Sequence, residues 1–175
     1  MTRLMNVIDY CPDWPVEYEK ETAALRKALG EILVRVHHIG STAVPGLAAK
    51  PVIDMLLEVT DLDALDALNA SMRSLGYEPR GEFGIPGRRY FPKGGDARTH
   101  HVHAFAAGAT QVLEHLAFRD YLRSHPKEIE AYGAVKRAAS EAHRTDPKGY
   151  VAYKSAHVSA LLNRALEWKQ QQIER

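Results

Sequence analysis

The sequence has only one cysteine, Cys11, and no long hydrophobic run. A single cysteine excludes an intrachain disulfide and suits a reducing compartment. No apolar stretch approaches the roughly 20 residues that a membrane-spanning helix needs, and the N-terminal segment lacks the continuous apolar core of a signal peptide. We therefore predict a soluble, cytoplasmic protein that has no membrane partner.

A strong net charge is absent as well. Lysine and arginine total 23 residues and aspartate and glutamate total 22, which gives a formal net charge of +1 at pH 7. This balance gives no strong signal for nucleic-acid binding, although it leaves room for a local basic patch. The chain has 175 residues, of which 45% are hydrophobic, and no internal repeat. It is long enough for one domain with a sizeable core.

Short apolar runs separated by glycine and proline fill the first part of the chain. Residues 13–30 predict a helix that starts near Asp13 and ends at Gly30. Residues 51–59 predict a strand that is apolar on both faces apart from Asp54, as expected for a central, buried strand. The same reasoning predicts a helix over 61–76 and strands over 32–40 and around 77–82, 88–92 and 99–106.

Long amphipathic helices follow from residue 110 to the end, because apolar residues recur three and four positions apart. We therefore predict an α+β protein, in which a mixed sheet carries a C-terminal helical segment packed on it. A single domain is assigned to residues 1–175, with the sheet core in 1–108 and the helical segment in 109–175. The sequence does not predict an oligomeric state.

A Gly-Ser pair, Gly40 and Ser41, ends the strand predicted over 32–40. Phosphate groups bind to backbone N–H donors, which glycine leaves accessible and which a helix N-terminus supplies together. Ser41 or Thr42 can cap such a turn, and Lys50 can add a positive charge. As a bare pattern, however, a Gly-Ser pair is more often a plain turn between a strand and a helix.

Asp54 lies inside an otherwise apolar strand. A buried carboxylate without a partner is unfavourable, so this side chain must meet a cation, a network of donors or a metal. The two-residue period of a strand places it on one face with Val52, Leu56 and Glu58. A structural carboxylate that accepts hydrogen bonds from loop amides is the alternative, and we favour the functional role.

Three histidines occur in the stretch THHVHAF, residues 99–105. His101 and His103 alternate along the predicted strand and project to one face, whereas His100 points to the other. Two imidazoles at this spacing can bind one metal together with a nearby carboxylate, or act as an acid, a base or a phosphate donor. Histidines bonded within a polar cleft are an equally good interpretation, and the sequence leaves both open.

Basic residues cluster in 80–98 and in the first C-terminal helix, where such charges usually belong to solvated surfaces. We consider Arg89 and Arg119 as helpers in phosphate binding, although Arg119 can equally pair with Asp120. Lys154 differs, because it lies at helical spacing with apolar residues. Its ammonium group either reaches outward to solvent or meets an anion.

The stretch HHIGSTAVPGLAAKPVID, residues 37–54, closely resembles the signature loop of the GrpB family, small proteins in the superfamily of nucleotidyltransferases related to DNA polymerase beta. The likeness continues through GIPGRRYFPK, RTHHVHAF, LAFRDYLRSHP and YVAYKSA, so it covers about residues 13–165. Residue by residue, the resemblance assigns Gly40 and Ser41 to the phosphate-binding pair of that superfamily and Asp54 to its first carboxylate.

The superfamily resemblance implies a mixed sheet with helices packed on it, whose Gly-Ser pair opens a helix and grips a triphosphate. It further implies two alternating carboxylates on the next strand and a third on a neighbouring strand. Together these hold two Mg²⁺ ions for in-line attack on the alpha-phosphate.

This sequence departs from the superfamily pattern at the second carboxylate, where it has Leu56. Glu58 shares the face but lies roughly 13 Å beyond Asp54 along the strand. His101 and His103 stand where the third carboxylate is expected. Because Mg²⁺ prefers oxygen ligands, an Asp-His-His set favours Mn²⁺, Zn²⁺ or Fe²⁺.

Three functions are compatible with these features. The first, which we favour, is a transferase that moves a nucleotidyl group from an NTP to a small-molecule or protein acceptor. Its catalytic residues and ligands for a divalent metal (Mg²⁺, Mn²⁺ or Zn²⁺) are predicted to be Asp54, His101 and His103. The second is a nucleotide or phosphoanion binding module without catalysis, which Leu56 favours. The third is a partner protein whose helical half mediates assembly.

Overall fold

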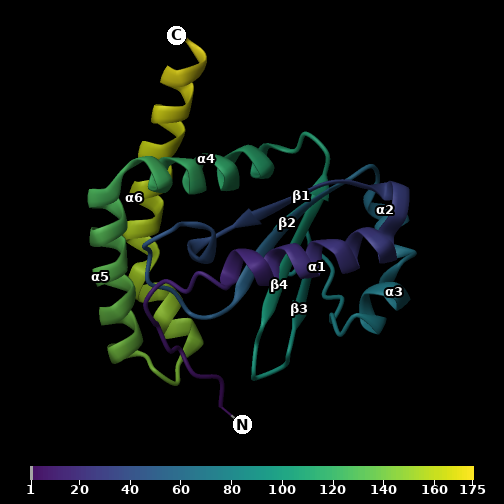
Figure 1. Cartoon of the computed structure of the whole chain (residues 1–175), viewed down its shortest axis with the longest axis horizontal. Coiled ribbons are helices and arrows are strands. Elements are labelled where there is room, and N and C mark those ends of the chain that lie inside the picture. Colours follow the sequence, from purple (N-terminus) through teal and green to yellow (C-terminus); the bar gives the residue numbers. More distant parts are fainter. Residues whose placement is uncertain (1) are drawn as a thin grey trace.

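The computed structural model describes residues 2–175 and contains a four-stranded mixed sheet with helices on both faces (Figure 1). The strands are β1 (Leu33–Ile39), β2 (Ile53–Val59), β3 (Arg89–Lys93) and β4 (His100–Ala106). The helices are α1 (Trp14–Leu29), α2 (Leu62–Asp66), α3 (Asn69–Ser74), α4 (Thr110–Ser124), α5 (Pro126–Ala142) and α6 (Pro147–Ile173). Two short 3-10 turns, η1 (Gly30–Ile32) and η2 (Ser41–Ala43), flank β1. The predicted mixed sheet followed by helices is confirmed.

The strand order is β1-β2-β4-β3, so β2 and β4 are central. β2 runs parallel to β4, and the two outer strands are antiparallel to their neighbours. The register places Asp54 beside His101 and Leu56 beside His103. Because side chains alternate along a strand, Asp54, His101 and His103 project from the same face, at the N-terminal ends of the two central strands.

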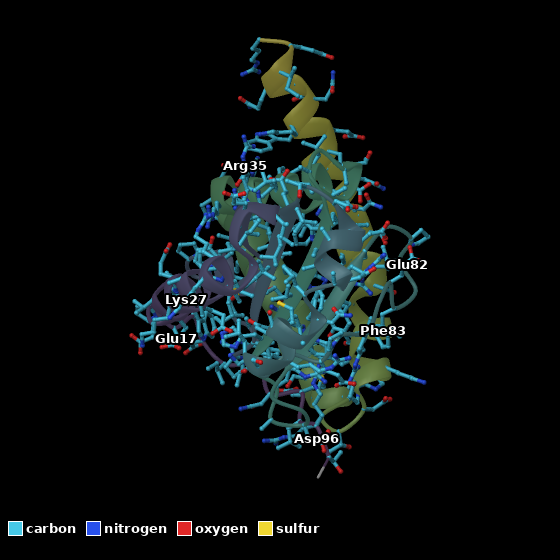
Figure 2. All side chains as sticks on the ribbon, turned by 90° about the vertical axis from the view of Figure 1, so that its right-hand side faces the viewer. Glu17, Lys27, Arg35, Glu82, Phe83 and Asp96 are labelled. Atoms are coloured by element: carbon cyan, nitrogen blue, oxygen red, sulfur yellow. The ribbon has the colours of Figure 1, made fainter. Side chains whose placement is uncertain are left out.

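The opposite face of the sheet carries the main hydrophobic core, which α1, α2 and α3 cover (Figure 1). Its central members are Met55, Leu57, Val102 and Ala104 from the strands and Leu25, Leu65 and Met72 from the helices. Figure 2 shows Glu17 and Lys27 of α1 on the other side of the sheet from Glu82 and Phe83, which belong to the loop before β3. The polar cluster therefore lies on the face away from α1.

The loop between β1 and β2 joins the sheet to the C-terminal helices. Leu47 in this loop packs with Tyr132 of α5 and Leu161 of α6, and Ala48 packs with Tyr150 of α6. The helices α4 and α5 each pack against α6. α5 and α6 stand beside the sheet (Figure 1), whereas α4 reaches over it, where Val112 packs with Leu56 and Phe105. This packing brings the start of β2 close to α5 and α6.

Two predicted elements differ from the structure. The helix predicted over 61–76 is divided into α2 and α3, although no glycine or proline marks the break. The strand predicted around 77–82 forms only one isolated bridge, from Tyr77 to Lys93, because Pro79 and Gly81 interrupt a regular ladder. Within residues 2–175, none of the helices has the length and apolar character needed to cross a membrane.

Candidate functional site

Asp54, His101 and His103 form one polar cluster, which we call the Asp-His-His cluster. Oδ1 of Asp54 lies 3.2 Å from Nδ1 of His101 and 3.3 Å from Nε2 of His103. Burial alone would raise the pKa of the Asp54 carboxyl, but hydrogen bonds from the two imidazoles hold that pKa well below its usual range. The carboxylate is therefore ionised at neutral pH.

Gly40 allows the backbone to approach this carboxylate closely. Its φ angle is +71°, a conformation that favours glycine, and a Cβ atom at this position would lie 2.8 Å from Oδ2 of Asp54. The next residues form only the three-residue turn η2. The Gly-Ser pair therefore does not open a full helix, as the superfamily pattern implied. Thr42 in the same turn is buried, and its hydroxyl bonds to Nε2 of His38 at 2.9 Å.

Arginines face the outer nitrogens of both imidazoles in the cluster. Guanidinium nitrogens of Arg3 and Arg98 each lie 3.4 Å from Nε2 of His101. A nitrogen of Arg88 lies 3.5 Å from Nδ1 of His103. A guanidinium can only donate, so the outer imidazole nitrogens accept and the nitrogens that face Asp54 carry the protons. Burial also lowers the pKa of His101, which favours the neutral ring.

A cavity of about 190 Å³ lies next to Asp54, and three lysines line it. Lys50 precedes β2, Lys136 belongs to α5 and Lys154 belongs to α6. We call this space the lysine cavity. The ammonium groups of Lys50 and Lys154 lie 4.7 and 4.6 Å from the centre of the Tyr150 ring. Three separate segments of the chain thus bring a cation to one small space.

Acidic side chains do not balance the charge of the lysine cavity. In the part of the chain that the structure describes, no carboxylate lies within ion-pair distance of these ammonium groups, and Asp54 is the one acidic residue in the lining. Burial lowers the pKa of Lys154, and it lowers that of Lys50 to about 8. Lys136 is 2% exposed, and burial together with the charges of the other two lysines holds its pKa well below its usual range.

The hydroxyl of Tyr150 is the second unusual feature of this cavity. The residue is fully buried, and its hydroxyl has no hydrogen-bond partner within residues 2–175. Buried polar groups are normally paired, so the unpaired hydroxyl of Tyr150 beside the buried Lys136, whose ammonium group lies 5.1 Å from the centre of the Tyr132 ring, is compatible with a ligand. An anion with several acceptor oxygens would satisfy both.

Sequence reasoning missed Lys136, although the same signal that singled out Lys154 was present. The buried residues of α5 include Tyr132, Gly133 and Ala139, which lie three and four positions from Lys136. A lysine in the middle of such a buried stripe is rare without a partner. The same helical spacing could therefore have singled out Lys136 together with Lys154.

A larger cavity of about 460 Å³ opens on the helical side of the cluster. Asp54 and Lys154 line both cavities, so the two spaces meet at the carboxylate. Phe118 and Tyr132 give the larger cavity aromatic surface. His115 also lines it, and burial lowers the pKa of this imidazole to about 4, which leaves it neutral at physiological pH.

The structure does not bring Arg89 or Arg119 to these cavities. The alternation of β3 puts Arg89 on the face of the main core, where it bonds to both oxygens of Asp66 at 2.7 and 3.0 Å. Arg119 pairs with Asp120 and donates to the carbonyl oxygen of His38 at 3.2 Å. It supports the backbone behind the Gly-Ser pair and does not line the cavities.

Leu56 occupies the position of the second carboxylate and is fully buried. It packs with Ile39, Phe105 and Val112 beneath α4. Glu58, two residues further along β2, bonds to Nε2 of His37 at 2.7 Å. The second acidic position is therefore part of a hydrophobic cluster, and the nearest carboxylate on the same strand face is engaged elsewhere.

The ligand atoms of the Asp-His-His cluster fit one divalent ion. They lie within 4.8 Å of one another, and a carboxylate with two imidazoles suits Mn²⁺, Fe²⁺ or Zn²⁺. The surroundings fit less well, because a metal-bound histidine normally donates its outer N–H to an acceptor. Here the outer nitrogens face guanidinium donors. An ion would have to displace the protons on the imidazole nitrogens that face Asp54, and the arginines would have to turn away if the outer nitrogens then carried protons.

A family model with the description "GrpB protein" matches residues 5–164 of this sequence. The chain belongs to the GrpB family. It is 40% identical over 167 residues to the UPF0157 protein YqkA of Bacillus subtilis, an alignment that covers 95% of this chain and 49% of YqkA. The chain thus spans about half the length of that relative.

Solved structures agree with this family assignment. A crystal structure of the conserved protein GrpB from Enterococcus faecalis has a TM-score of 0.91 and 42% sequence identity, and the match covers 94% of this GrpB-family chain and 99% of that one. The Cid1 poly(U) polymerase with MgGTP bound has a TM-score of 0.54 at 14% identity, over 74% of this chain and 43% of Cid1. The second likeness shows a fold shared with that poly(U) polymerase.

Proposed function

We propose that this GrpB-family chain binds the phosphate groups of a nucleotide in the lysine cavity, beside a divalent ion held by Asp54, His101 and His103. From this position it would transfer the nucleotidyl group to a small-molecule or protein acceptor. The observation that carries the proposal is the convergence of Lys50, Lys136 and Lys154 next to the one ionised carboxylate of the cavity. The nucleotidyltransferase-like fold supports the same function.

The side chains have separable tasks in this proposal. The lysines would neutralise the phosphate chain and the pyrophosphate that leaves when an acceptor oxygen bonds to the alpha-phosphorus. The larger cavity has the size and the aromatic lining to take the nucleoside, with Phe118 and Tyr132 available for contact with a base. When bound, a metal ion would polarise the phosphoryl oxygens as a Lewis acid. The Asp54 carboxylate and the two imidazoles would hold that ion at the junction of the two cavities.

A binding module without catalysis is the second candidate, and Leu56 favours it. Two-metal transfer needs a second carboxylate on this strand face. Leu56 has no carboxylate and is packed into a hydrophobic cluster, so this position cannot supply a metal ligand. A module of this kind would keep the lysine cavity and bind the nucleotide without changing it.

Turnover of labelled NTPs in Mn²⁺ or Mg²⁺ tests the transferase, with Asp54→Asn as the matched variant. The transferase predicts turnover by the wild-type chain and loss of turnover in the folded variant. Thermal stabilisation by nucleotides without turnover of any NTP would instead favour the binding module. If no nucleotide or phosphate ester shifted the melting temperature, both proposals would fail and an assembly role would be left.

A further inference from the structure

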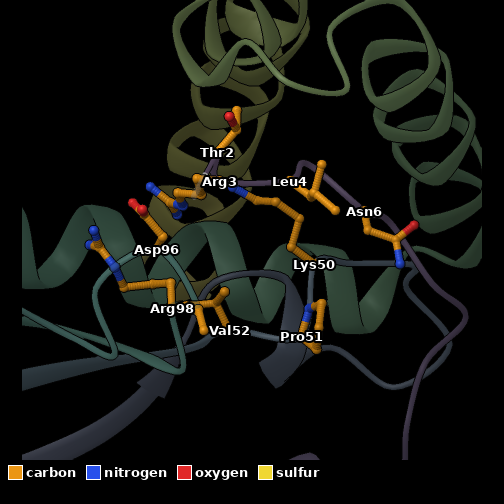
Figure 3. Close-up of a pocket in the computed structure, with 10 residues that line it drawn as sticks. Thr2, Arg3, Leu4, Asn6, Lys50, Pro51, Val52, Asp96 and Arg98 are labelled. Carbon is orange, nitrogen blue, oxygen red and sulfur yellow. The ribbon is translucent and has the colours of Figure 1, made fainter.

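A second cationic pocket lies on the outer side of His101 and outside the lysine cavity. Its volume is about 370 Å³, and its lining includes Arg3, Lys50, Asp96 and Arg98 (Figure 3). We call it the arginine pocket. Lys50 lines both this pocket and the lysine cavity, so the two spaces are neighbours. The charged residues of the pocket are three cations and one carboxylate.

Two guanidinium groups converge on one imidazole in this pocket. Arg3 and Arg98 each approach Nε2 of His101 to 3.4 Å. That nitrogen has a single lone pair, so it cannot satisfy two guanidinium groups at once. Burial, and after it the charge of Arg98, lowers the pKa of Arg3. The two cations are therefore held against their mutual repulsion.

Asp54 offsets only part of this repulsion at Arg3. Over residues 2–175, no carboxylate lies within ion-pair distance of either guanidinium, although Asp96 contributes to the lining. Arg98 donates to the carbonyl oxygen of Gly95 at 3.0 Å and to the hydroxyl of Tyr90 at 3.4 Å, and both acceptors are neutral. Two partly buried guanidinium groups that share one imidazole acceptor are unfavourable, and an anionic ligand would reduce that cost.

The backbone on both sides of the pocket is fixed, so the pocket is present before a ligand arrives. Met5, two residues after Arg3, is fully buried, and its N–H donates to the carbonyl oxygen of Arg144 at 2.8 Å. Thr99, which follows Arg98, donates its N–H to the carbonyl oxygen of Lys93 at 2.9 Å. Preformed donors lose little freedom when they bind an anion.

We propose that the arginine pocket binds a phosphate group through Arg3, Lys50 and Arg98, separately from the phosphates in the lysine cavity. A tetrahedral phosphate offers enough oxygens for two guanidinium forks and one ammonium group. It would also draw the two arginines away from the imidazole of His101. The group is either the terminal phosphate of a chain that continues from the lysine cavity or the phosphate of a separate molecule.

This inference deepens the proposed function by adding a second phosphate position, and its binding test does not depend on catalysis. Titration calorimetry of the full chain with inorganic phosphate should resolve two binding events. Arg98→Gln and Arg3→Gln should each weaken one event by about tenfold or more, the range for losing a charge-assisted hydrogen bond. Lys154→Met should weaken the other event. Arg35→Gln is the control, because Arg35 is exposed on β1, away from both spaces (Figure 2).

A comparison of an NDP with the matching NTP separates the two sources of the phosphate. If the terminal phosphate of the nucleotide occupies the pocket, Arg98→Gln should remove the affinity that the NTP gains over the NDP. If a separate molecule occupies it, the NTP-to-NDP ratio should be unchanged, while phosphate binding to the NTP-saturated protein is lost in Arg98→Gln.

The inference is overturned if phosphate binding and the NTP-to-NDP ratio are the same in Arg3→Gln, Arg98→Gln and Arg35→Gln. That result, with an intact response to Lys154→Met, would leave the proposed nucleotide site standing. In the reverse pattern, phosphate binding is weakened in the arginine variants and unchanged in Lys154→Met. That result would overturn the nucleotide site and keep the arginine pocket.

Discussion

At the scale of single residues, Gly40 sets how closely the backbone approaches the Asp54 carboxylate. Replacement by alanine would place a Cβ 2.8 Å from Oδ2 of Asp54 and would also strain a φ angle of +71°. Gly46 in the same loop has a φ of +86° and open space around its Cβ position. Gly46→Ala therefore measures the backbone strain alone.

We predict that Gly40→Ala lowers the free energy of unfolding by more than Gly46→Ala, which should cost about 1 kcal/mol. The excess arises because the new methyl group must displace the Asp54 carboxylate. Urea denaturation of the two variants measures it, and nucleotide binding should be weakened only in Gly40→Ala. Equal destabilisation by the two substitutions would show that the close approach to Asp54 is unimportant.

Lys136 is buried at a cost to stability, which the proposed ligand would offset. Lys136→Met keeps the volume and removes the charge, so we predict a free energy of unfolding about 1–4 kcal/mol higher than wild type at pH 7. Phosphate affinity should fall at the same time. Because burial lowers the pKa of the lysine in the folded state, the gain should shrink as the pH rises toward about 10, where the unfolded chain also loses the proton.

Thermal or urea unfolding at pH 7 and pH 10 checks the prediction for Lys136, with Lys148→Met at an exposed position of α6 as control. The control should change stability little at either pH. A destabilised Lys136→Met protein that binds phosphate normally would contradict the ligand role and make Lys136 a structural residue.

At the scale of elements, α4 holds the turn that carries the Gly-Ser pair. Arg123 donates from Nε to the carbonyl oxygen of Ala43 at 2.8 Å. We predict that Arg123→Met raises amide hydrogen exchange over 40–48 and weakens nucleotide binding, because this charged hydrogen bond contributes about 1.5–3 kcal/mol. Arg73→Met, at an exposed site on α3, is the control. Unchanged exchange in Arg123→Met would show that packing alone fixes the turn.

Periodicity in the sequence predicted most of the strands and helices, because each has a regular buried face. The division of the helix predicted over 61–76 was not predictable in this way, since Ala67 and Leu68 at the break are not helix breakers. Strand alternation predicted that His101 and His103 share a face, whereas the position of Asp54 beside them depends on the pairing of β2 with β4. The faces of Arg89 and Arg119 depended on register and on helix packing, which local patterns do not contain.

At the scale of the whole molecule, the lysine cavity exists only because the sheet and the helical segment pack together. Lys50 comes from the sheet side and the other two lysines from α5 and α6. No local sequence pattern could bring these three residues together, so the cavity was not predicted as a unit. The sequence did contain the local signal for two of them, because Lys136 and Lys154 each lie at helical spacing with apolar residues.

The charge of this shared cavity should make anion binding depend on pH. Burial lowers the pKa of Lys50 to about 8, so Lys50 is charged at pH 7 and loses its proton as the pH rises through that value. We predict that sulfate, which does not titrate in this range, binds more weakly at pH 9 than at pH 7. We also predict that the protein takes up a proton at Lys50 when sulfate binds. Calorimetry in two buffers of different ionisation enthalpy measures both effects, and equal affinity at the two pH values would contradict the account.

In the proposed function, the Asp-His-His cluster and the lysine cavity form one nucleotide site. The most direct measurement is Mn²⁺ binding by electron paramagnetic resonance, with and without non-hydrolysable analogues of the four NTPs. We predict that an analogue tightens Mn²⁺ binding, that Asp54→Asn abolishes Mn²⁺ binding, and that Lys136→Met with Lys154→Met removes only the effect of the nucleotide. An Mn²⁺ affinity that is unchanged by the nucleotide analogues and by Asp54→Asn would contradict a shared nucleotide and metal site.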